Sequence, residues 1–298
     1  MNQYPWLELL YDNLRQYNQI HPLSLIVTAE NGLGVDAMIK SWIQSLICEH
    51  NVCHKCQQCQ LMKSNSHPDY WEAVNDKSVA IDDIRSILNF IYLKPRSASK
   101  RIVYIPFAEK LTLQASNALL KILEEPPAHA VFILGVENDA LLLPTILSRC
   151  IVFNANSIDV SMATQWLKGQ LNCSLQESEL RMILSANRPL IAKGMNLTQV
   201  NEFLSNCMNP TKPLSELEPV PDDILQWVHL MQIQICRVLQ DEEGMNKKAS
   251  IFLIEWYYIL SKFSKRLHRS VVWNKEIIWE EILLALRWHY CKFFKASQ

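Results

Sequence analysis

The feature that most constrains the fold is a pair of glycines between an apolar run and a segment of helical periodicity. Leu23–Ala29 has the length and apolar character of a buried strand, and Gly32 and Gly34 follow it closely. Beyond them, apolar residues recur at the three- and four-residue spacing of a helix that is buried on one side. They are Ala37, Met38, Ile39, Trp42, Ile43, Leu46 and Ile47. This order of strand, glycine turn and helix predicts the opening of a mononucleotide-binding α/β unit.

Three further short apolar runs predict more buried strands. Tyr70–Val74, Arg101–Ile105 and Val131–Leu134 are separated by stretches long enough for helices, the pattern of a parallel sheet. One such stretch, Ser116–Glu125, is predicted to be a helix that ends at Pro126–Pro127. We therefore expect an α/β domain over residues 1–155.

The rest of the chain is expected to be helical. Ile158–Cys207 contains no strand-like run and predicts a small helical domain over residues 156–208. Prolines between positions 210 and 221 give linker composition, and an all-α domain is expected over residues 209–298. Its long apolar-rich segments are Asp222–Leu239, Ala249–His268 and Lys275–Phe294.

Tryptophan is concentrated in this last region. Five of the nine tryptophans lie there: Trp227, Trp256, Trp273, Trp279 and Trp288. Such residues thicken a core or bury a face against another subunit. We expect contact with partner subunits.

The glycine turn lacks the side chains that bind a nucleoside triphosphate. A phosphate-binding loop reads G-x-x-x-x-G-K-[ST], in which the Lys neutralises phosphate oxygens and the hydroxyl holds magnesium. With Gly34 as the second glycine, the first glycine is replaced by Ala29 and the Lys by Val35. The hydroxyl position is Asp36, whose carboxylate would repel phosphate. The degenerate turn of Gly32, Gly34, Val35 and Asp36 therefore predicts no functional nucleotide site.

The second element of an ATPase site, a carboxylate pair at the end of an apolar strand, is missing as well. Arg101–Ile105 runs directly into Pro106 and Phe107, and Glu109 lies beyond the strand end. Proline and phenylalanine neither bind magnesium nor polarise a water molecule. The chain is therefore not expected to hydrolyse ATP.

Four cysteines within twelve residues have the spacing of a metal site. They are Cys48, Cys53, Cys56 and Cys59. Four soft thiolates suit tetrahedral zinc, and the role would be structural because four protein ligands leave no open position for chemistry. A redox thiol pair or unliganded cysteines are the alternatives, and His50 or His54 could replace one thiolate.

Bulk composition excludes several classes of protein. The net charge of −1 gives no global positive field that would attract nucleic acid. No stretch approaches 18 uninterrupted apolar residues, and Met1–Leu10 lacks the basic start and apolar run of a secretory signal. We therefore predict a cytoplasmic protein without a membrane span.

The order of these motifs resembles the delta-prime subunits of the bacterial DNA polymerase III clamp loader along nearly the whole chain. The combination of clamp-loader ATPase motifs with a broken phosphate-binding loop is what selects this family. Besides the glycine turn and the cysteines, the matching segments are Tyr4-Pro5-Trp6-Leu7, Cys59-Gln60-Leu61-Met62, His67-Pro68-Asp69-Tyr70, Ser116–Lys121, Leu123-Glu124-Glu125-Pro126-Pro127 and Leu147-Ser148-Arg149-Cys150.

The resemblance implies an α/β AAA+ module with a zinc insertion at residues 48–59, a small helical lid domain and an all-α collar domain. It implies a subunit that does not hydrolyse ATP. With gamma/tau and delta subunits, it would form a hetero-pentamer that loads the sliding clamp onto primed DNA. Val136 and Leu190 stand where active loader ATPases carry a sensing polar residue and a lid arginine.

The resemblance also implies a role for Arg149, with Ser148 beside it. In this family the arginine of Ser-Arg-Cys is an arginine finger, which reaches into the ATP site of a neighbouring subunit and stabilises charge on the transferring phosphoryl group. The alternative for Arg149 is an ordinary surface salt bridge.

Two other functions compete with this interpretation. One is an active, gamma/tau-like ATPase motor subunit of the same loader, which Val35, Asp36, Pro106 and Phe107 oppose. The other is an unrelated zinc-containing nucleic-acid-binding protein. Its phosphate contacts would come from Lys55, Lys63 and the basic stretch Lys94, Arg96, Lys100 and Arg101.

Overall fold

A computed structural model describes the chain over residues 4–50, 52–73, 79–185, 187–197, 254–264 and 274–295, together with residues 224, 228, 231 and 232. The chain divides into two compact units, Met1–Trp166 and Leu167–Gln298. The division into three domains at residues 155 and 208 stays a prediction.

The first unit is built on a parallel sheet in the order β2-β3-β4-β1-β5. The strands are β1 (Leu23–Thr28), β2 (Tyr70–Glu72), β3 (Arg101–Ile105), β4 (Ala130–Val136) and β5 (Ile151–Asn154). The central strands β3 and β4 are buried along their whole length, as their unbroken apolar runs predict. The parallel α/β prediction is therefore confirmed for this unit.

Strand β5 was not predicted from the sequence. It is an edge strand whose residues are largely exposed, and it pairs with β1 only. A strand that is exposed at the edge of a sheet does not need a long apolar run, so the sequence of β5 has no distinctive pattern.

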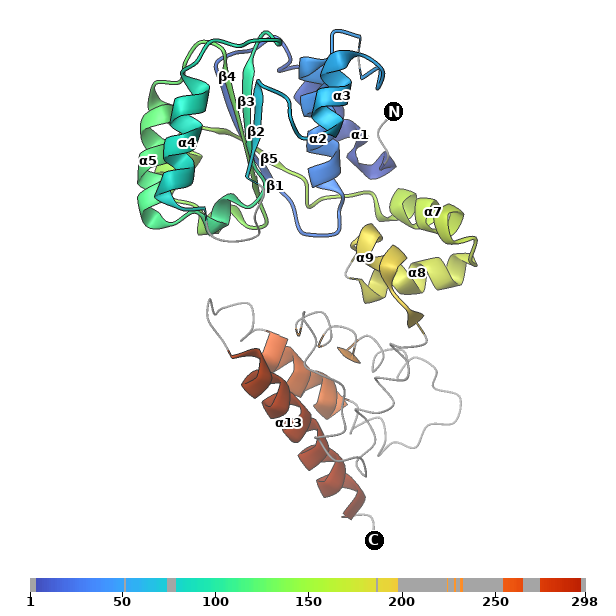
Figure 1. Ribbon diagram of the computed structural model, residues 1–298. Coiled ribbons are helices and arrows are strands. Elements are labelled where there is room, and N and C mark those ends of the chain that lie inside the picture. The colour runs from blue at the N-terminus through green and yellow to red at the C-terminus, as the bar shows by residue number, and fades with distance from the viewer. Residues whose placement is uncertain are drawn as a thin grey trace. The chain divides into compact units, whose positions relative to one another are not determined.

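Helices cover both faces of the sheet (Figure 1). On one face lie α1 (Glu8–Arg15) and α2 (Val35–Ile47), and α3 (Gln57–Lys63) follows the cysteine-containing loop. On the other face lie α4 (Ile81–Ile91) and α5 (Leu113–Glu124). Their buried residues form one apolar core with β3, β4 and the short helix α6 (Pro144–Leu147). Three short 3-10 helices, η1 (Pro5–Leu7), η2 (Ala108–Lys110) and η3 (Asp139–Leu141), join these elements.

Helix α5 shows how local sequence sets the limits of an element. The Thr112 side chain accepts a hydrogen bond from the backbone N–H of Ala115 and so caps the first turn. The helix ends at Glu124, before the proline pair at 126 and 127 that cannot continue it. The predicted helix over Ser116–Glu125 is confirmed and begins one turn earlier.

Beyond the sheet the described chain is helical. Helix α7 (Val160–Leu171) crosses the division between the units, and α8 (Leu175–Leu184) and α9 (Pro189–Gly194) follow. Residues 254–264 are helical, and α13 spans Lys275–Lys295. Most of the predicted segment Asp222–Leu239 lies outside the described residues. None of the helices in the described part of the chain combines the length and apolarity that crossing a membrane requires.

The tryptophans of this last region differ in burial. Trp256 and Trp279 are buried, whereas 60% of Trp288 is exposed. Trp227 and Trp273 lie outside the described residues. Two of the five therefore contribute to a core, and contact of this region with partner subunits stays a prediction.

Candidate functional site

The glycine turn between β1 and α2 is covered by aromatic side chains. Gly34 has a left-handed backbone, with φ at 83°, and forms the N-cap of α2. A Cβ atom at Gly34 would lie 2.5 Å from Cε2 of Tyr4, so the tyrosine ring occupies the space beside the turn. The Nε1 of Trp6 donates a hydrogen bond to the carbonyl of Leu33, at 2.9 Å. Contacts from the N-terminal segment, which holds Tyr4 and Trp6, therefore fix the conformation of the turn.

The aromatic cover has a third member. The rings of Tyr4 and Trp6 stack with their centroids 5.4 Å apart, and Trp166 meets Trp6 edge-on at 4.9 Å. Tyr4 and Trp6 are buried. Such offset and edge-on pairs add stability beyond the burial of their area. The cluster ties the N-terminal segment and the middle of α7 to the glycine turn.

Asp36 and Lys40 are engaged with protein groups on α2 and the sheet. Asp36 accepts a hydrogen bond from the hydroxyl of Tyr104 at 2.9 Å, and it pairs with Lys40 at 3.1 Å. Lys40 also pairs with Glu72, at 2.9 Å. Burial lowers the pKa of Lys40, but Glu72 and Asp36 outweigh it and raise the pKa above its ordinary value. The charge of Lys40 is therefore already paired with two carboxylates, and Lys40 does not replace the missing lysine of a phosphate-binding loop.

The strand end where an ATPase would hold magnesium is also unsuited to it. Glu109 lies in η2, and burial raises the pKa of its carboxyl above the ordinary value. Val136, the last residue of β4, is buried. Valine offers no oxygen ligand to a hard cation, and Glu109 lies beyond the strand end.

The four cysteines come together between α2 and α3. Their Sγ atoms all lie within 4.8 Å of one another. The Sγ of Cys48 is 3.8 Å from that of Cys53 and 3.8 Å from that of Cys56. A tetrahedral site with metal–sulfur bonds of about 2.3 Å has sulfurs about 3.8 Å apart. With this spacing the four thiols together could hold one metal ion. Among the described residues, the cluster contains no histidine.

Local backbone structure aims these sulfurs. Cys48 is the C-cap of α2 and Cys56 is the N-cap of α3, so two helix ends fix two ligands. The backbone N–H of Cys56 donates to Sγ of Cys53 at 3.3 Å, and that of Cys59 donates to Sγ of Cys56 at 3.5 Å. His54 adopts a left-handed backbone, with φ at 57°, inside the turn. Such N–H donors stabilise thiolates and orient metal ligands.

The thiols differ in acidity. Hydrogen bonds from the backbone N–H groups of Lys55 and Cys56 lower the pKa of Cys53 to about 6. Burial raises the pKa of Cys59 to about 12. Cys150, outside the cluster, has its pKa raised to about 12 by burial and is an inert thiol.

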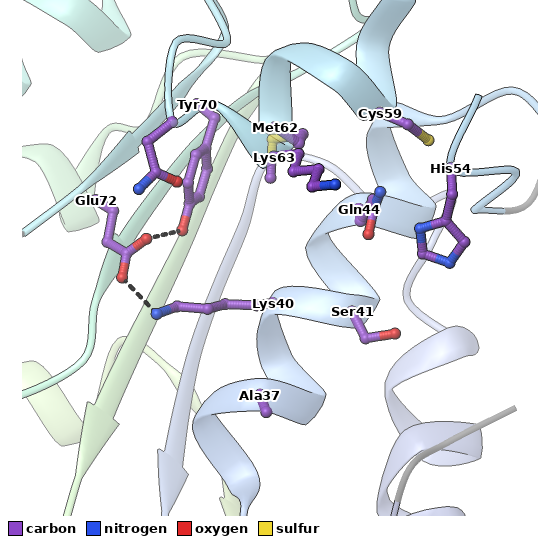
Figure 2. Close-up of a pocket in the computed structure, with 11 residues that line it drawn as sticks. Ala37, Lys40, Ser41, Gln44, His54, Cys59, Met62, Lys63, Tyr70 and Glu72 are labelled. Carbon is purple, nitrogen blue, oxygen red and sulfur yellow. Dashed lines mark hydrogen bonds and ion pairs between the residues drawn. The ribbon is translucent and has the colours of Figure 1, made fainter. Parts of the chain in front are cut away.

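A pocket of about 590 Å³ is lined by residues of α2, of β2 and of the segment 54–65 (Figure 2). The Lys40–Glu72 ion pair forms part of its wall, and the hydroxyl of Tyr70 donates to Glu72 at 2.7 Å. The other lining residues are Ala37, Ser41, Gln44, His54, Cys59, Met62, Lys63 and Asn65.

Half of the basic stretch that could contact phosphates is buried. Arg101 donates to the carbonyl of Lys94 at 2.9 Å and lies over the ring of Phe90 at 4.6 Å. Lys100 is buried and donates to the carbonyl of Asn18. Lys94 and Arg96 are exposed. Lys100 and Arg101 are thus structural residues, which weakens the nucleic-acid-binding alternative.

Arg149 lies on the surface between α6 and β5. Its Nη2 pairs with Glu124 at 2.7 Å, and its Nη1 donates to the carbonyl of Thr145 at 2.8 Å and to Oγ of Ser148 at 3.2 Å. One third of the Arg149 side chain is exposed. The salt bridge that was the alternative for Arg149 is therefore present, on a side chain that is partly exposed.

Sequence reasoning missed several partners in these sites. Tyr4 above Gly34, Glu72 beside Lys40 and Glu124 beside Arg149 all come from distant segments. Periodicity and spacing carry no signal for such contacts. The segments holding Tyr4 and Glu124 attract notice only through their resemblance to family motifs.

Comparison with known proteins agrees with the motifs. The family model described as "DNA polymerase III, delta subunit" matches residues 6–159, more than half of the chain. The protein "DNA polymerase III subunit delta'" of Haemophilus influenzae is 34% identical over 196 residues. The match covers 63% of this chain but only 60% of that relative.

Two further similarities extend over most of the chain. The "DNA polymerase III subunit delta'" of Buchnera aphidicola subsp. Schizaphis graminum is 27% identical, with 100% of this chain and 92% of that protein covered. A solved structure, a DNA polymerase III gamma subunit-related protein from Thermotoga maritima, matches with a TM-score of 0.50 and 18% identity. It covers 94% of this chain and 99% of its own, which shows a shared fold. By motif order, family model and curated relatives, the chain belongs to the DNA polymerase III delta-subunit family, within the group named subunit delta'.

Proposed function

We propose that this chain is a non-hydrolysing subunit of the clamp loader. It would assemble with gamma/tau and delta subunits in a hetero-pentamer and help to load the sliding clamp onto primed DNA. The observation that carries the proposal is the glycine turn, where Tyr4 covers Gly34 and Asp36 stands at the hydroxyl position. A turn with neither lysine nor hydroxyl gives the phosphates and magnesium no partner.

In this proposal Arg149 acts in trans, as an arginine finger on a neighbouring ATPase subunit. Its support is the Ser-Arg-Cys motif together with an arginine side chain that is one third exposed. A finger stabilises the charge that develops on the transferring phosphoryl group and contributes on the order of a thousandfold or more to turnover. Ser148 beside it accepts one of its hydrogen bonds.

The four cysteines would hold a structural Zn²⁺ ion in the same proposal. Four thiolates form a closed donor set of the kind that zinc prefers, and the sulfur spacing fits a tetrahedral site. The metal would supply rigidity to the segment between α2 and α3. The chemistry of the loader would stay on the neighbouring subunits.

The test is steady-state ATPase activity of the reconstituted loader, with clamp and primed DNA, for wild type and Arg149→Ala. Assembly is measured in parallel by gel filtration. We expect intact assembly and a clear loss of turnover. Unchanged turnover in an intact complex would show that Arg149 is an ordinary surface residue. ATP hydrolysis by the isolated chain would instead support the gamma/tau-like motor subunit.

A further inference from the structure

The contact between Arg149 and Glu124 has a geometry suited to positioning the guanidinium. Glu124 is the last residue of α5, and its Oε1 lies 2.7 Å from Nη2 of Arg149, 25 positions further along the chain. Nη1 donates to the carbonyl of Thr145 and to Oγ of Ser148. The guanidinium is therefore held by three oxygen atoms from two separate segments.

These contacts leave part of the guanidinium available. An arginine side chain has five N–H donors in a fixed plane. The three hydrogen bonds engage Nη1 twice and Nη2 once, so two of the five donors are not used by these contacts. One third of the side chain is exposed, which gives a ligand access. The arrangement orients the guanidinium without using all of its donors.

The two segments that hold Arg149 share one buried core. Leu123 on α5 and Ile146 on α6 are buried in the same apolar core, so the two segments that hold Arg149 are packed together. A carboxylate at a helix C-terminus is disfavoured by the helix dipole, and a guanidinium beside it offsets that cost. Glu124 thus has a local reason to keep Arg149 as its partner.

We infer that Glu124 is a positioning residue for Arg149, an inference that rests on the proposed finger role. A free arginine side chain samples many rotamers, and ordering it on binding costs free energy. Glu124, Thr145 and Ser148 restrict the guanidinium before a neighbouring subunit presents its phosphates. Electrostatic stabilisation is strongest when the group is already in place.

The experiment uses the full loader, reconstituted with Glu124→Ala, Glu124→Gln, Arg149→Ala or the double variant of Glu124→Ala and Arg149→Ala. We expect Glu124→Ala to lower kcat for ATP several-fold with KM unchanged, because the neighbour's own loop binds the nucleotide. Glu124→Gln keeps an acceptor oxygen for Nη2 and should retain more activity. In the double variant the loss should equal that of Arg149→Ala alone.

Glu125→Ala is the matched control, since Glu125 is an exposed carboxylate one residue away; it should leave kcat unchanged. Three results would overturn the inference while Arg149→Ala still impairs turnover: no effect of Glu124→Ala, a gain in turnover, or additive losses in the double variant. A gain would identify Glu124 as a restraint that phosphate must displace. If Arg149→Ala itself has no effect in an intact complex, the proposed finger role fails, and the inference fails with it.

Discussion

The ring of Tyr4 fills the space that a side chain at Gly34 would need, since a Cβ there would lie 2.5 Å from the tyrosine Cε2. The contact joins the N-terminal segment to the first turn of the α/β unit, 30 positions further along the chain. It makes the glycine turn a packed structural element.

The first prediction concerns this contact. Gly34→Ala should lower the free energy of unfolding by at least about 1–2 kcal/mol, because a left-handed backbone alone costs that much for a residue with a side chain. Displacement of Tyr4 adds to the loss. Chemical denaturation of the isolated chain measures it.

Gly169→Ala is the control, because a Cβ there meets no atom within 4 Å and the residue lies in helix α7. It should be neutral or stabilise by up to about 1 kcal/mol. If Gly34→Ala is as stable as this control, the Tyr4 contact is not a constraint.

The second prediction concerns metal. Purified protein should contain one zinc ion per chain, and Cys53→Ser with Cys56→Ser should abolish it, because two of four ligands are lost. Chelation should make the segment between α2 and α3 sensitive to protease. Elemental analysis and limited proteolysis measure the two effects.

Cys150→Ser, outside the cluster, should leave the zinc content unchanged. Full zinc retention in the double variant would mean that the metal is bound elsewhere. A chain that never contains zinc would favour unliganded cysteines.

The third prediction concerns Asp69, whose side chain is fully buried. Its carboxylate accepts hydrogen bonds from the backbone N–H groups of Arg96, Ser97 and Ala98 at 2.8, 2.6 and 2.8 Å, and Arg101 lies 3.6 Å away. Asp69→Asn should cost about 3–5 kcal/mol, because it leaves the buried Arg101 charge without its partner. Asp82→Asn, at an exposed ion pair, should cost less than about 1 kcal/mol.

Asp69 also predicts behaviour in acid. Burial raises the pKa of this carboxyl, but the three N–H donors and Arg101 outweigh it and hold the pKa below its ordinary value. The stability that it contributes is present above about pH 4 and is lost as pH falls through the lower folded-state pKa. Acid titration of unfolding should show a shallower loss for Asp69→Asn; parallel curves would contradict this assignment.

The fourth prediction concerns His67, which is buried and lies along the chain between α3 and β2. Its Nδ1 accepts from the backbone N–H of Asp69 at 3.1 Å, so the neutral ring carries its proton on Nε2 and donates it to Gln58 at 2.7 Å. Burial lowers the pKa of His67 below its ordinary value. The unfolded chain therefore binds the proton more readily, and stability should fall as pH drops below about 6.5.

His67→Asn keeps an acceptor for the Asp69 N–H and cannot titrate in this range. Its stability should vary less between pH 7 and pH 5 than that of the wild type. Equal slopes for the two proteins would show that His67 does not control this part of the pH dependence.

Much of the first unit can be predicted from the sequence. The strands β3 and β4 are buried on both faces, and such strands must be apolar throughout, so their runs stand out. The cysteine cluster can be predicted as well, because short gaps confine the four sulfurs to one turn and two helix ends. Strand β5 could not be predicted, since an exposed edge strand need not be apolar throughout.

The sequence alone determined which side chains stand at the positions of a phosphate-binding loop and where four candidate metal ligands lie. Val35 and Asp36 remove the phosphate and magnesium partners whatever their surroundings. The four cysteines lie within a segment of twelve residues, close enough to reach one ion. Only the tertiary structure decided that Tyr4 covers Gly34, that Lys100 and Arg101 are buried, and that Glu124 holds Arg149. Those contacts join segments 25 or more positions apart or depend on burial, so they follow from the path of the chain through the packed sheet and not from local residue order.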